Sequence, residues 1–136
     1  MMSKNIQTVD NDDRSTAISI GDTDYELVLT TKATKQIAAK YGGLSDLGDK
    51  LMQPENFELA LDEIVWLITL LANQSILIHN LKNKDSPKPL LTDEEVELLT
   101  SPLELAAYKD AIVEAMFKGT KRNIESEEDS KNGAVG

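Results

Sequence analysis

The sequence predicts an α+β fold that is mostly α: an N-terminal β-hairpin packed on a bundle of about four to five helices around one long buried helix. Three features support this prediction. Residues 57–81 form the longest apolar run, residues 17–29 alternate in polarity around a glycine, and helix-capping patterns begin at Thr92 and Ser101. With 136 residues, the chain is predicted to be one domain, with its globular part over residues 17–119.

The hairpin is predicted over residues 17–29. Residues 17–20 and 25–29 alternate between apolar and polar side chains, and Gly21 between them supplies a turn conformation that other residues resist. An isolated hairpin is marginally stable in water, so it must pack on the helices. Residues 1–16 are polar overall and are expected to form a disordered N-terminal tail.

Two helices are predicted before the central one. The first covers residues 31–41, where Thr30 or Thr31 can accept hydrogen bonds from the free backbone amides at its start. Gly42 is expected to end this helix in a left-handed conformation. The second helix is short and covers residues 45–53.

The central helix is predicted over residues 55–81, directly after Pro54. Within residues 64–72 only Thr69 is polar, and a helix that is apolar nearly all round is buried by other segments of its own chain or of another copy. We expect no membrane crossing, because polar residues interrupt the run after residue 72. A narrow polar line, interrupted by Trp66, follows one side of the helix: Glu58, Asp62, Thr69, Asn73 and Asn80.

The rest of the chain is predicted as a link followed by two capped helices. Residues 82–91 are polar and contain prolines, so we expect a mobile loop there or a segment that becomes ordered on a partner. The helices are predicted over residues 93–99 and 102–118. Gly119 is expected to end the last helix, and residues 120–136 are expected to form a disordered C-terminal tail.

Composition excludes several kinds of chemistry. The chain has no cysteine, which excludes disulfides, zinc–thiolate sites and thiol catalysis. Its net charge of −10 repels nucleic acid and anionic membranes, so we expect neither as a partner. His79, the one histidine, has no paired nucleophile or acid, and no phosphate loop or metal-ligand spacing is present. We therefore expect no enzyme, no catalytic residue, no metal site and no cofactor.

The chemistry that remains is binding. Trp66 breaks the polar line of the central helix, which suggests partial exposure, and tryptophan is enriched among interface hot spots. The alternative is a tryptophan that closes the hairpin over the core, and for Tyr108 core packing is favoured. The candidate partner-binding residues lie on the central and last helices: Trp66, Asn73, Leu77, Tyr108, Ile112 and Met116.

The order of these motifs resembles a known family. A hairpin and a helix lead to Lys40-Tyr41-Gly42-Gly43-Leu44, and a very apolar helix follows with Ile64-Val65-Trp66-Leu67. The step into the last helix reads Leu98-Leu99-Thr100-Ser101-Pro102. Over residues 17–119 the chain resembles the tail assembly chaperones of long-tailed phages and prophages of Gram-positive bacteria.

The resemblance implies a role without catalysis in the host cell cytoplasm. Proteins of this family bind and coat the long, helical tape-measure protein before the tail tube polymerises around it, and they are absent from the mature virion. The implied partner is the tape-measure protein, with the tail tube protein and a second copy of the chain as further candidates. The family has no catalytic or metal residues to carry over.

Three other functions stay open. The chain could be a structural head–tail or tail component of the virion. It could be an acidic DNA mimic that inhibits a nucleic-acid-binding protein, although lysines interrupt its carboxylates. It could also be a small helical regulator that works as a homo-oligomer, because the central helix is apolar on nearly all sides.

Overall fold

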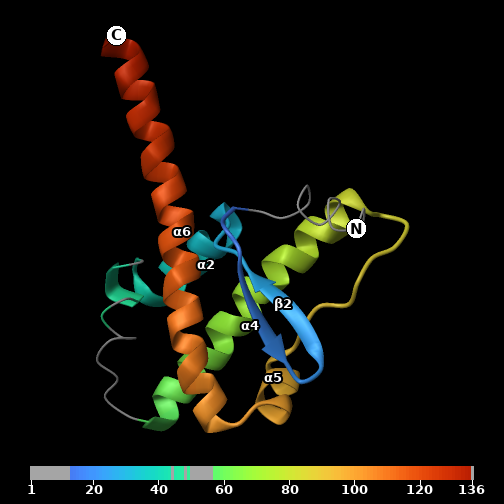
Figure 1. Cartoon of the computed structure of the whole chain (residues 1–136). Coiled ribbons are helices and arrows are strands. Elements are labelled where there is room, and N and C mark those ends of the chain that lie inside the picture. Colours follow the sequence, from blue (N-terminus) through green and yellow to red (C-terminus); the bar gives the residue numbers. More distant parts are fainter. Residues whose placement is uncertain (1–12, 44, 48, 50–56, 136) are drawn as a thin grey trace.

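The computed structural model describes residues 13–43, 45–47, 49 and 57–135, and most of them are helical (Figure 1). The elements, in chain order, are β1 (Thr16–Ile20), β2 (Thr23–Leu27), α2 (Thr31–Tyr41), α4 (Phe57–Lys82), α5 (Asp93–Leu99) and α6 (Pro102–Val135). A two-stranded hairpin packed on helices confirms the predicted α+β, mostly α class. Of the predicted N-terminal tail, residues 1–12 lie outside the described residues, and β1 begins at Thr16.

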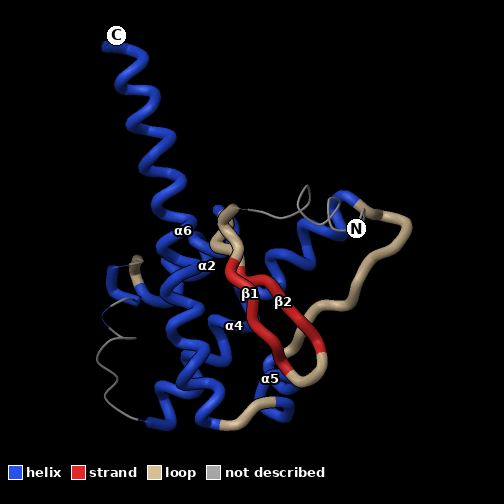
Figure 2. The backbone as a smooth tube through the Cα atoms, viewed as in Figure 1, coloured by secondary structure: helices blue, strands red, loops and turns tan. Residues whose placement is uncertain are grey.

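The two strands pair as an antiparallel hairpin (Figure 2), in a register that places Thr16 opposite Leu27. Gly21 at the turn has a φ of 62°, a left-handed conformation that glycine adopts easily. Buried and exposed residues alternate along β1, and one face of the hairpin therefore lies against the helices, with β1 on α6 and β2 on α4. The predicted hairpin is confirmed, although its second strand ends at Leu27 rather than at residue 29.

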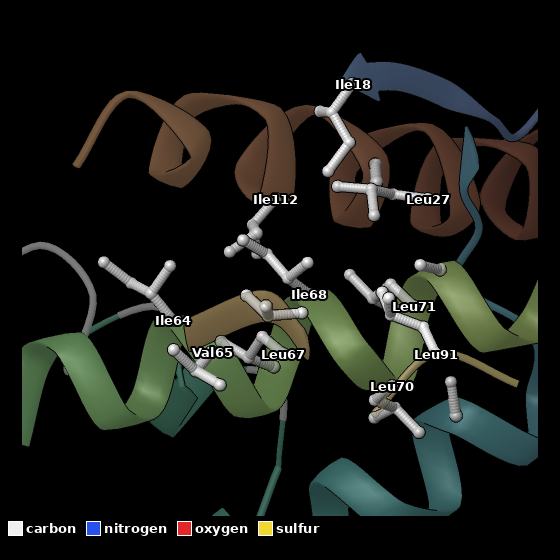
Figure 3. Packing of buried hydrophobic residues seen from close by; sticks show 14 of the residues in the cluster. Ile18, Leu27, Ile64, Val65, Leu67, Ile68, Leu70, Leu71, Leu91 and Ile112 are labelled. Carbon is white, nitrogen blue, oxygen red and sulfur yellow. The ribbon is translucent and has the colours of Figure 1, made fainter. Parts of the chain in front are cut away.

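α4 is the centre of the fold, as predicted. It crosses behind the hairpin and contacts β2, α5 and α6 (Figure 1). In Figure 3, Ile18 and Leu27 of the hairpin and Ile112 of α6 gather above Ile68 and Leu71 of α4. The buried apolar side chains of α4 form a large part of the core: Ile64, Val65, Leu67, Ile68, Leu70, Leu71, Ala72 and Ile76.

The segment Ala60–Lys82 of α4 is long and apolar enough to cross a membrane by length and composition alone, with a mean hydropathy of 1.5. Half of its most apolar window, 50%, is buried inside the fold. The core helix of a soluble protein has the same properties, and the expectation of no membrane crossing stays a prediction.

The predicted helix caps are present. Thr30 accepts a hydrogen bond from Ala33 N at 3.0 Å and begins α2, and Gly42 ends it with a φ of 98°. Of the predicted helix 45–53, residues 45–47 and 49 are helical, and its other residues lie outside the described part of the chain. Capping boxes begin the last two helices: Thr92 with Glu95, and Ser101 with Glu104.

Gly119 does not end the last helix, and that prediction is wrong. α6 continues to Val135 and extends beyond the rest of the fold (Figure 1). That residues 120–136 form a disordered tail stays a prediction. Gly119 is buried, and a Cβ atom there would lie 2.9 Å from Leu29 Cβ and 3.1 Å from Leu29 O. The glycine therefore lets α6 approach the segment after β2 closely.

Candidate binding surfaces

Trp66 lies half-buried where α4 passes the C-terminal end of α2. Its ring meets Tyr41 edge to face, with 6.0 Å between the ring centroids and 73° between the ring planes. Lys40 Nζ lies 4.9 Å from the centroid of the indole ring, within cation–π range. Trp66 is thus partly exposed, as predicted, but side chains of its own chain already contact it.

Tyr41 strengthens this contact between the two helices. Its hydroxyl donates a hydrogen bond to a carboxylate oxygen of Glu63 on α4. Burial, this hydrogen bond and the negative charge of Glu63 raise the pKa of the Tyr41 phenol far above its ordinary value. The cluster of Lys40, Tyr41, Glu63 and Trp66 therefore joins α2 to α4.

Asn73 binds the backbone of the segment that follows α4. Its side-chain amide donates to Leu91 O at 2.8 Å and accepts from Leu91 N at 2.7 Å. Asn80, two turns along the same face of α4, makes the same pair of hydrogen bonds with Lys88, at 3.0 and 2.8 Å. Residues 83–91, here called the strap, are thus tied to α4 at Lys88 and Leu91. The mobility expected of this segment stays a prediction.

The three candidates on α6 lie against the rest of the fold. Tyr108 donates a hydrogen bond to Ser19 O of β1, and burial followed by the charge of Glu104 raises the pKa of its hydroxyl. Met116 is half-buried and packs against the core. Ile112 is fully buried (Figure 3) and belongs to the core of this chain, so it presents no exposed surface to a partner.

The six predicted residues therefore do not form one surface. Trp66 lies beside α2, and Asn73 is occupied by the strap. Leu77 is half-buried on the same side of α4 as Asn73. The α6 candidates face the hairpin and the core.

The opposite side of α6 carries exposed apolar side chains. Leu103 is 82% exposed, Phe117 63% and Val113 42%. The other large exposed apolar residues of the described chain are Leu81, Leu90, Leu98 and Leu99. We call the exposed residues of α6 between positions 103 and 117 the outer face: Leu103, Glu104, Ala106, Ala107, Asp110, Val113, Glu114 and Phe117.

α6 thus has two apolar stripes, and only the inner one was predicted from the sequence. Successive residues are about 100° apart around a helix, so a shift of two positions moves a stripe to nearly the opposite side. The inner stripe consists of Leu105, Tyr108, Ile112, Ala115 and Gly119. The outer stripe consists of Leu103, Ala106, Val113 and Phe117, with Asp110 in its middle. The residues of the outer stripe are also spaced three and four apart, and this spacing could have been used to predict the stripe from the sequence.

The polar groups of the described residues offer little for catalysis. His79 Nε2 lies 3.1 Å from Ser86 O of the strap, and Asn83 Nδ2 lies 3.3 Å from His79 Nδ1. Among the described residues, no group of three or more His, Asp or Glu side chains could hold a metal ion. That the protein is not an enzyme stays a prediction.

Comparisons with protein-family models, with curated proteins and with solved structures give no match.

Proposed function

We propose that the protein is a phage tail assembly chaperone. It binds the tape-measure protein in the host cytoplasm and keeps it soluble until the tail tube assembles, and it is not part of the mature virion. Two observations support the proposal. The order of the sequence motifs resembles that of this family, and the outer face of α6 carries an exposed apolar stripe.

The outer face has the properties that this role requires. A helical client with an apolar side needs a partner that presents apolar side chains at helical spacing, and helices bind one another in this way. Leu103 and Phe117 are among the most exposed large apolar residues of the described chain, and they lie on one side of one helix. The net charge of −10 keeps such a chaperone soluble while it carries an apolar client.

Co-expression with the tape-measure protein of the same phage or prophage tests the proposal. We expect the wild-type chain to raise the soluble fraction of the tape-measure protein and to co-purify with it. Phe117→Glu places a charge in the apolar stripe and is expected to abolish this capture. Leu81→Glu is the matched control, because Leu81 is 70% exposed but lies at the end of α4. A wild-type chain that captures no tape-measure protein would refute the proposed function.

Purified particles separate this function from a role in the virion. Mass spectrometry of such particles should find the tape-measure protein and not this chain. A stoichiometric amount of the chain in the particles would support a structural tail or head–tail component instead.

A further inference from the structure

The exposed charges of the outer face all have one sign. Asp110 and Glu114 are exposed, whereas the two lysines in the same part of α6 are only half-exposed. Glu104 is exposed as well, but its carboxylate accepts a hydrogen bond from Ser101 N at the start of α6. Lys118 Nζ donates to Ser15 O at 2.7 Å and pairs with Glu114 at 3.1 Å, so it is drawn toward the start of β1. The outer face therefore presents an apolar stripe accompanied by carboxylates.

Asp110 has a special position in this stripe. It lies midway between Leu103 and Phe117, at the same three-and-four spacing as the apolar residues around it. A helix packed on the outer face must therefore place a group opposite or beside this carboxylate. An apolar group there would remove Asp110 from water without a partner, whereas a lysine or arginine would pair with it.

We propose that the outer face of α6 binds an amphipathic helix whose apolar stripe is accompanied by lysine or arginine side chains. The inference rests on the proposed function and names the kind of tape-measure segment that is bound. From Leu103 to Phe117 the stripe extends about 21 Å along the helix axis, which is four turns of a partner helix.

The charge of Asp110 also disfavours two other possible occupants of the outer face, a second copy of the chain and an anionic membrane. If two copies packed symmetrically through their outer faces, Asp110 at the middle of one stripe would face Asp110 of the other. Two carboxylates in contact across an interface repel each other. An anionic membrane surface is repelled by the same carboxylates. A basic helix is the occupant whose charge complements the outer face.

Two synthetic peptides with identical leucine positions test the inference on the full chain: LKKLLKLLKKLLKL and LEELLELLEELLEL. We expect fluorescence anisotropy of labelled peptides to show binding of the lysine peptide and none of the glutamate peptide. Asp110→Lys should weaken binding of the lysine peptide about tenfold, because a local attraction becomes a repulsion. Glu26→Lys on β2 changes the net charge equally at an exposed site away from α6, and it should change the affinity by less than about twofold at physiological salt.

Three results would overturn the inference. Equal weakening by Asp110→Lys and Glu26→Lys would show that only the total charge matters. Equal binding of both peptides would show that the carboxylates do not select the partner. A wild-type dimer that Phe117→Glu dissociates in sedimentation analysis would show that a second copy covers the outer face.

The test is separate from that of the proposed function. Capture of the tape-measure protein that is unaffected by Asp110→Lys would leave the chaperone function standing and refute the basic-helix inference. Failure of the wild-type chain to capture the tape-measure protein would refute the function, whatever the peptides do.

Discussion

Replacing Gly119 by alanine is expected to destabilise the protein, although alanine is the better helix former. In a helix interior the substitution gains up to about 1 kcal/mol. The added Cβ, however, would lie 2.9 Å from Leu29 Cβ and 3.1 Å from Leu29 O, whereas carbon atoms prefer about 3.5–4.0 Å. Overpacking of this kind costs about 1–3 kcal/mol, and the net loss in the free energy of unfolding is therefore about 1 kcal/mol.

Urea denaturation followed by far-ultraviolet circular dichroism measures this loss, which corresponds to about 4 °C in melting temperature. Gly43→Ala is the matched control, because no heavy atom lies within 4 Å of a Cβ at that position. It should leave the stability unchanged within about 0.5 kcal/mol.

Gly119→Asn distinguishes close packing from a left-handed helix end. A left-handed position tolerates asparagine better than alanine, but a crowded helical position rejects asparagine more strongly because it is larger. We therefore expect Gly119→Asn to be less stable than Gly119→Ala. The reverse order, or an alanine variant more stable than the wild type, would refute the explanation from packing against Leu29.

Two further predictions concern hydrogen bonds on α4. Asn73→Ala should lower the free energy of unfolding by about 1–3 kcal/mol, because two part-buried hydrogen bonds to Leu91 are lost. Asn80→Ala should lower it by less than about 1 kcal/mol, because water can replace its exposed hydrogen bonds to Lys88. Urea denaturation of the two variants compares these losses. The pKa of Tyr41 is raised in the folded state, so the folded protein keeps this proton above a pH of about 10 while the unfolded chain loses it. Stability should therefore fall as the pH rises above that value, and Tyr41→Phe should make the fall shallower than in the wild type.

The parts of the fold that local patterns determine were predicted from the sequence. The hairpin turn at Gly21, the cap at Thr30 and the capping box at Thr92 each depend on a few neighbouring residues. The burial of α4 follows from its composition, because no arrangement in water leaves so many apolar side chains exposed. Such features need no knowledge of how distant segments meet.

The parts that depend on distant contacts were not predictable in this way. Gly119 has the same appearance in sequence whether it ends a helix or approaches Leu29, and only the packing decides between the two. The helical spacing of polar residues correctly placed Asn73 and Asn80 on one side of α4. Their hydrogen-bond partners, Leu91 and Lys88, lie in a segment without regular secondary structure, so no repeating pattern could predict the contacts.

The outer face of α6 connects the fold to the proposed function. Part of the polar line of α4 is used within the chain, since Thr69 donates to Val65 O and Asn73 binds the strap. Trp66, which interrupts the line, lies under Lys40. The inner stripe of α6 packs on the core, whereas Leu103, Val113 and Phe117 of the outer stripe are exposed among the described residues. Exposed leucine and phenylalanine at helical spacing lower solubility unless a partner covers them. The proposed basic partner helix would cover these side chains, and charge reversal at Asp110 is the most direct test of that proposal.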